Sequence, residues 1–139
     1  MIKKIVTDRE LLSQPCEPAT AEDAALAQDL LDTLATDDEY ACLAANQIGA
    51  TKRVVVYRDA ADRPHVMFNP QLKRGLRPSR VEETCLSLDE ASKVTRFDQI
   101  MVTYDELVED TLIPRRREFR GWTAQVVQHM IDHCNGKLV

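Results

Sequence analysis

The chain has 139 residues, a formal net charge of −5 and a hydrophobic fraction of 44%, values that suit one globular domain over residues 1–139. No apolar run approaches the roughly 18 residues that a membrane helix needs, so we expect no membrane span. The negative net charge argues against sequence-independent binding of nucleic acid, which depends on Lys and Arg side chains that neutralise phosphates. No apolar stretch follows Lys3 and Lys4 to mark a secretory signal, so we predict a cytoplasmic protein.

Four cysteines lie far apart in the sequence, at Cys16, Cys42, Cys85 and Cys134, and none of them forms a CxxC pair. Without an export signal this spacing argues against disulfides, so each cysteine is a candidate core residue, metal ligand or nucleophile. The basic run Arg115–Arg117 fits a solvated strand edge or turn, and a role in steering an acidic partner stays open.

The first predicted helix covers Thr20 to about Leu34. Thr20 can cap this helix together with Asp23 in an approximate capping box. Leucines recur on one face of the helix at positions 26, 30, 31 and 34. From Leu43 to about Ile100 the pattern changes to β segments.

Apolar and β-branched runs separated by polar turns predict the strands. We expect strands at Arg53–Tyr57, at Val66–Phe68 with its end at Asn69-Pro70, at Ile100–Tyr104 and at Arg117–Arg120.

A second helix is predicted from Trp122 or Thr123 to His133, with Thr123 as a possible cap and Gly136 as a stop signal beyond its end. Its apolar contacts would be Val126, Val127, Met130 and Ile131. The order of helix, several strands and helix favours an α+β fold over alternating βαβ units.

His129 and His133 are spaced i and i+4 on this helix, so their imidazoles project from one face about one turn apart. Two ligands of a single metal ion need this arrangement, although histidines at this spacing also occur in structural or surface roles. Met130 stands where an HExxH motif has its glutamate, and a thioether cannot accept or return a proton at neutral pH. By itself Met130 is interpreted as a helix packing residue.

Cys85 lies between predicted strands, far from this helix in the sequence. A free cysteine is commonly a small buried apolar residue. A thiolate there could instead complete a Cys/His/His site with a fourth position open for water, which is the arrangement of catalytic metals. The segment Leu43–Gly49, with its small residues and the Gln47 amide, is interpreted as a helix-to-strand connection.

Three motifs in this order resemble the signatures of peptide deformylases, the hydrolases that remove the formyl group from N-terminal formylmethionine of new chains. That family carries GxGLAAxQ, EGCLS and QHExDH. This chain has YACLAANQ at Tyr40–Gln47, ETCLS at Glu83–Ser87 and QHMIDH at Gln128–His133. The likeness covers nearly the whole chain, since residues 8–16 and 68–70 also resemble family segments.

The resemblance implies an α+β fold with mixed or antiparallel sheets around a helix that carries both histidines. It implies one divalent metal ion, Fe²⁺ in the native bacterial enzymes with Zn²⁺ or Ni²⁺ as substitutes, held by Cys85, His129 and His133. An activated water would attack the formyl carbon, and the Gln47 side-chain amide and the Leu86 backbone N–H would stabilise the oxyanion.

The resemblance also implies the partner, an N-formylated nascent peptide or a related N-terminal peptide, while no nucleic acid or membrane partner is expected. The residues implied to contact this peptide are Tyr40, Ala41, Cys42, Leu43, Trp122, Gln125 and Val126. Gln125 would then be polar in an apolar methionine pocket. Glu83 would support a ligand histidine or pair with Arg96, with a surface salt bridge as the alternative.

The departures from the family motifs concern catalysis more than fold. Tyr40, Cys42 and Thr84 replace motif glycines, and their side chains should narrow or reshape the substrate groove. Met130 replaces the glutamate that shuttles protons, a loss that typically costs ~10²–10⁴ in rate. We therefore expect weak or altered deformylase activity. The alternatives are a catalytically degenerate metal- and peptide-binding module of the same fold, and a structural protein with a vestigial site.

Overall fold

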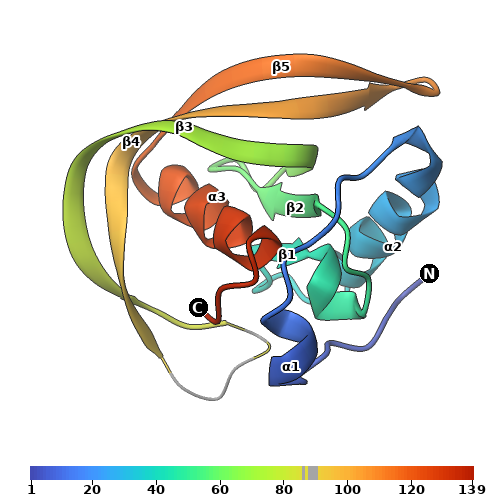
Figure 1. Ribbon diagram of the computed structural model, residues 1–139, viewed down its shortest axis with the longest axis horizontal. Coiled ribbons are helices and arrows are strands. Elements are labelled where there is room, and N and C mark those ends of the chain that lie inside the picture. The colour runs from blue at the N-terminus through green and yellow to red at the C-terminus, as the bar shows by residue number, and fades with distance from the viewer. Residues whose placement is uncertain (86, 88–90) are drawn as a thin grey trace.

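The computed structural model describes residues 1–85, 87 and 91–139, and its centre is a five-stranded antiparallel sheet in the order β1-β2-β3-β4-β5. The strands are β1 (Cys42–Ala44), β2 (Val54–Arg58), β3 (Pro64–Glu83), β4 (Ser92–Val108) and β5 (Thr111–Arg120). The long strands β3, β4 and β5 curve around the helix α3 (Gly121–Cys134), and α2 (Ala24–Leu34) lies on the other side of β2 (Figure 1). The short helix α1 (Arg9–Leu12) and single turns at Ala21–Asp23 and Ala45–Ile48 complete the elements. This is the predicted α+β class.

Strand β2 separates two hydrophobic clusters. Val55 and Tyr57 pack with α3 and with the inner face of β3, β4 and β5, while Val54 and Val56 pack with α2 and with Leu43. Because side chains alternate along a strand, a strand covered on both faces needs a continuous apolar run, and Val54–Tyr57 supplies it.

The start of α2 is specified locally, as the sequence predicts. The Asp23 carboxylate accepts a hydrogen bond from the Thr20 backbone N–H at 2.9 Å, and Thr20 caps the turn with its own hydroxyl. This capping box is followed by Leu30 and Leu34, which are fully buried against the sheet. The predicted capping box is therefore confirmed, but it caps the single turn Ala21–Asp23, and α2 itself begins at Ala24 without a side-chain capping bond.

The predicted strand end at Asn69-Pro70 is wrong, because β3 continues to Glu83. The register of β3 against β4 shifts between Phe68 and Gln71, where Asn69 has a φ of 54°. A bulge accommodates a proline inside a strand because it interrupts the pairing of the two strands. The Asn69 amide also binds both backbone groups of Ala19, at 2.7 and 3.0 Å, and so fixes the segment before α2.

Helix α3 begins at Gly121, and its N-cap is Arg120, which makes no side-chain capping bond. The predicted cap at Thr123 is therefore wrong, since that residue already lies inside the first turn. The predicted contacts Val126, Val127, Met130 and Ile131 are buried, and Gly136 follows the helix end. Among the described residues no helix is both long and apolar enough to cross a bilayer.

Gly136 provides a test of how α3 is joined to α1. It has a φ of +77°, and a Cβ built there would lie 2.6 Å from the Ser13 backbone oxygen. We expect Gly136→Ala to lower the free energy of unfolding by about 3 kcal/mol, from left-handed strain and contact with rigid backbone. Urea denaturation measures this loss.

The matched control is Gly121→Ala, because Gly121 has a φ of +58° with nothing within 4 Å of the added Cβ. It should lose only about 1 kcal/mol. Equal losses in the two variants would contradict a steric role for the contact between Gly136 and Ser13.

Candidate metal centre

Cys85, which follows the end of β3, lies next to His129 and His133 of α3. The Cys85 Sγ atom lies 3.3 Å from His133 Nε2, and His133 Nε2 lies 3.1 Å from His129 Nε2. All three ligand atoms lie within 4.8 Å of one another. Both histidines are buried, with 6% of His129 and 1% of His133 exposed.

These atoms fit one metal ion. Ligand atoms about 2.0–2.3 Å from a tetrahedral ion lie roughly 3.3–3.8 Å apart, close to the separations of His133 Nε2 from its two neighbours. The Nδ1 atom of His129 is 2.8 Å from Glu83 Oε1, and an ionised carboxylate only accepts hydrogen bonds. A proton therefore sits on Nδ1, and Nε2 is the nitrogen of His129 that faces the other two donors.

Glu83 belongs to a buried ionic network that links β3, β4 and α3. Its carboxylate forms a bidentate pair with Arg96, at 2.9 and 2.7 Å, and also accepts the bond from His129. Arg96 further donates to Asp132 Oδ2 at 2.7 Å. Only 8% of Glu83 and 6% of Arg96 is exposed, so this is no surface salt bridge. Both roles implied for Glu83 are present at once.

The network sets the charges of the site. Burial opposes ionisation of Glu83, but the hydrogen bonds from His129 and Arg96 outweigh it and lower the Glu83 pKa to about 2. Burial also disfavours His129 as a cation, but the hydrogen bonds to Cys85 and Glu83 outweigh it and raise its pKa to about 9, so a metal ion that binds there would have to displace a proton from Nε2. Burial, with repulsion from His129, lowers the pKa of His133 to about 3, so His133 is neutral, as a metal ligand must be.

Gln47 lies beside Cys85 with its amide in a fixed orientation. Its Oε1 atom accepts the Ala44 backbone N–H at 2.9 Å, which directs Nε2 towards Cys85 Sγ at 3.3 Å and Ser87 Oγ at 3.2 Å. One amide donor thus lies next to the candidate metal ligands. The other predicted oxyanion donor, the Leu86 backbone N–H, lies outside the described residues.

Met130 has two environments. It is 1% exposed and packs in the α3 cluster, yet it also borders a cavity of about 250 Å³ together with Gln47, Cys85 and His129. Tyr40, Ala41 and Cys42 line the same cavity. Desolvation raises the pKa of the Cys42 thiol to about 12, so this thiol keeps its proton at neutral pH.

A neighbouring cavity of about 290 Å³ extends from the same residues to the start of α3. Trp122, Gln125 and Val126 line it, together with Cys42 and Thr84. Six of the seven predicted peptide contacts therefore border one of the two cavities. The exception is Leu43, whose side chain is fully buried in the cluster on the α2 side.

Two residues of the third motif have structural roles that sequence reasoning missed. Gln128 accepts the Phe97 backbone N–H at 2.9 Å and donates to the Phe97 carbonyl at 2.8 Å, which fixes α3 against β4. Asp132, also on α3, accepts a hydrogen bond from Arg96 of β4. Their place inside the motif, beside the histidines, was the only available signal.

The Glu83 network can be tested through metal affinity. We expect Glu83→Gln to weaken Zn²⁺ binding about 10–100-fold, because the amide no longer orients and polarises His129 as a carboxylate does. Competition against a chromophoric chelator measures the affinity, and circular dichroism checks that the variant folds. The control is Glu82→Gln, which changes the same charge at an exposed neighbouring position. Equal losses in both variants would refute the orienting role.

Comparison with known proteins places these features in a family. The family model described as polypeptide deformylase matches residues 2–139. A peptide deformylase from Clostridium beijerinckii is 38% identical over 140 residues, which is 100% of each chain. The solved class I type b peptide deformylase from Acinetobacter baumannii is 27% identical with a TM-score of 0.84, over 99% of this chain and 97% of that one.

The solved peptide deformylase from Thermus thermophilus is 29% identical, with a TM-score of 0.85 over 99% of this chain and 83% of that one. These matches extend over the whole described fold, including the strands and the helix that bear the candidate ligands. The chain therefore belongs to the peptide deformylase family.

Proposed function

We propose that this protein is a slow metal-dependent hydrolase that removes the formyl group from formylmethionyl peptides. The observation that carries the proposal is the cluster of Cys85, His129 and His133 within 4.8 Å, with the Gln47 amide beside it at the wall of a cavity. Family membership supports the same activity. An N-formylated nascent peptide as substrate and a cytoplasmic location complete the proposal.

Cys85, His129 and His133 would hold one divalent ion, and the proposed native ion is Fe²⁺, with Zn²⁺ or Ni²⁺ able to replace it. One thiolate and two imidazoles suit all three ions. When bound, the ion supplies Lewis acidity towards water and towards the formyl carbonyl. Glu83 keeps His129 in the tautomer that this role requires, through the 2.8 Å bond at Nδ1.

Gln47 is the proposed donor to the developing oxyanion, because its Nε2 lies next to Cys85 and its amide cannot rotate without losing the bond from Ala44. A donor fixed in advance stabilises charge in the transition state without reorganising. We assign the Leu86 backbone N–H the same role by its place in the second motif.

With Met130 in place of the motif glutamate, the proposed site has no general acid/base at this position. A thioether can neither take a proton from water nor give one to the leaving amine, and the typical effect is a loss of ~10²–10⁴ in rate. The second candidate function follows from the same side chain: a module that binds metal and an N-terminal peptide without turning the peptide over.

Restoring a carboxylate at position 130 separates these two functions. We expect Met130→Glu to raise kcat/KM for a formyl-Met peptide at least about tenfold in metal-loaded protein, because a general acid/base is returned to the cavity wall. The matched control is Met130→Gln, which has nearly the same shape and cannot shuttle protons.

Metal content is measured for every variant, so that a change in loading is not read as a change in chemistry. An equal gain in the Glu and Gln variants would contradict the missing-proton account. No gain in either would place the defect in the groove, at Tyr40, Cys42 and Thr84.

Gln125 should weaken the preference for methionine, because it places an amide in the cavity at the start of α3. We expect Gln125→Leu on the Met130→Glu background to raise kcat/KM for formyl-Met peptides about fivefold, with little change for formyl-Gly peptides. Hydrolysis of the two peptides under identical metal loading measures the ratio. An equal change for both peptides would mean that Gln125 does not contact the first side chain.

A further inference from the structure

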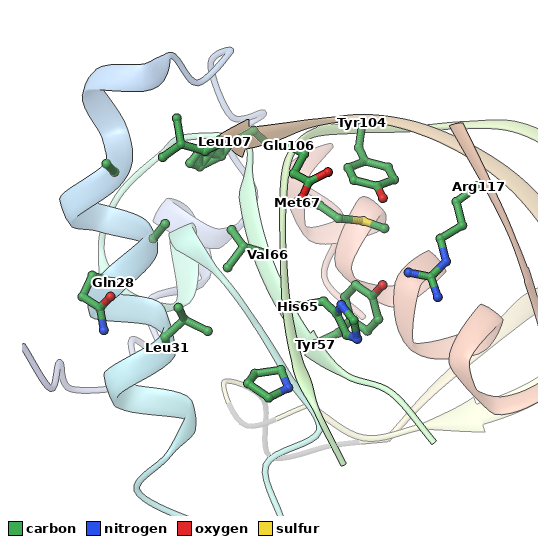
Figure 2. A pocket seen from close by; sticks show the side chains of 14 residues that line it. Gln28, Leu31, Tyr57, His65, Val66, Met67, Tyr104, Glu106, Leu107 and Arg117 are labelled. Atoms are coloured by element: carbon green, nitrogen blue, oxygen red, sulfur yellow. The ribbon is translucent and has the colours of Figure 1, made fainter. Parts of the chain in front are cut away.

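Another cavity, of about 610 Å³, lies away from the metal centre, between α2 and the diverging ends of the sheet (Figure 2). Its lining comes from α2, β2, β3, β4 and β5, and it includes none of Cys85, His129 and His133. This volume exceeds the 250 Å³ of the cavity at the metal centre and falls within the usual range for small-molecule sites.

The cavity exists because the sheet splits. Residues 64–67 of β3 pair with β2, whereas the pairing of β3 with β4 begins only at Phe68 and Asp105. Beyond Asp105, β4 pairs with β5 alone. The first turns of α2 cover part of the gap with Ala24, Ala27 and Gln28. The cavity is thus built into the strand register.

One end of the cavity carries three hydrogen-bond donors, from Tyr57, Tyr104 and Arg117. Tyr57 is 2% exposed, yet within the described part of the chain its hydroxyl makes no hydrogen bond. Tyr104 also points its ring into this end, and the guanidinium of Arg117 extends towards it from β5 (Figure 2). Burial raises the Tyr57 pKa to about 12, so this hydroxyl remains a donor at neutral pH.

Neighbouring residues hold these donors in place. The Tyr57 ring stacks on His65 with 5.1 Å between centroids, and His65 Nε2 lies 2.7 Å from the Asp59 carboxylate. Arg117 lies over the Phe119 ring, 5.1 Å from its centroid. No ion pair of Arg117 is found among the described residues. The one carboxylate of the lining, Glu106, is bound by Arg115 at 2.8 Å.

The other end of the cavity is apolar and lies on the α2 side of β3, whereas Tyr57 and Tyr104 lie on its other side. Leu31 of α2, Val66 of β3 and Leu107 of β4 line this apolar end (Figure 2). A ligand that satisfies both ends needs one negative charge with oxygen acceptors and a short hydrocarbon chain.

We propose that this cavity binds a small organic monocarboxylate, with its carboxylate on Arg117, Tyr57 and Tyr104 and its hydrocarbon chain against Leu31, Val66 and Leu107. Guanidinium and hydroxyl donors to an ionised carboxylate form charge-assisted hydrogen bonds, which are stronger than neutral ones. The hydroxyl of Tyr57, which faces the cavity, would then gain a hydrogen-bond partner that the described residues do not supply.

Titration of the full-length protein with octanoate tests this site, with octanol and octylamine as probes of the same chain length. Calorimetry should show saturable binding of octanoate at millimolar concentration, and octanol should bind at least about tenfold more weakly because it lacks the charge. Equal binding of octanol and octanoate, or no saturable binding of octanoate, would overturn the proposal.

Variants locate the carboxylate. Arg117→Met should weaken octanoate binding about tenfold, and Tyr57→Phe, which removes one oxygen and keeps the ring, should weaken it about threefold. The matched control is Arg116→Met, which removes the same charge from the adjacent position on β5, outside the cavity lining. Equal losses for Arg116→Met and Arg117→Met would reduce the effect to net charge and overturn the assignment.

Octanoate could also bind a metal ion at Cys85 and the histidines, so its position is read directly. In methyl NMR spectra of metal-loaded protein, octanoate should shift the signals of Leu31, Val66 and Leu107. Val126, which borders the cavity beside the metal centre, should stay unchanged. Shifts confined to Val126 would show that the carboxylate binds at the metal centre and would overturn the proposal.

Discussion

The buried pairing of Glu83 with Arg96 is the interaction on which both fold and site depend. Arg96 comes from β4, Glu83 ends β3, and Asp132 and His129 come from α3, so one set of charges joins three elements. Such charges are costly to bury alone, and removing one partner leaves the other uncompensated. The orientation of a candidate metal ligand is thereby coupled to the contact between sheet and helix.

Local signals in the sequence predict some of these features and miss others. The capping box of Thr20 and Asp23 acts within one turn, and the α+β order of elements follows from hydrophobic periodicity. Asn69-Pro70 looks like a strand end when the sequence is considered alone. The bulge that accommodates the proline depends on how β3 pairs with β4, which is a long-range feature. The hydrogen bonds of Asp132 and Gln128 are made to Arg96 and Phe97 of β4. The spacing of residues within the motif gives no information about these partners. The meeting of Cys85 with the histidines was inferable only through family resemblance.

Met130 satisfies the packing requirements of α3 at a position where the family motif has a glutamate. The side chain is 1% exposed and packs among apolar residues of α3, where a methionine is stable without any partner. A carboxylate there would need compensation for its burial. With Met130 at this position, the helix, its two histidines and the Glu83 network are all in place.

The position of α3 in the chain has a consequence for biosynthesis. This helix follows every strand in sequence, yet it fills the concave side of the sheet that those strands form (Figure 1). While a ribosome is still making the helix, Ile100, Val102 and Phe119 lack the side chains of α3 with which they share a hydrophobic cluster. Nascent chains stalled before Gly121 should consequently expose apolar surface and bind chaperones. The imidazoles of His129 and His133 would approach the Cys85 thiol only after α3 has been made.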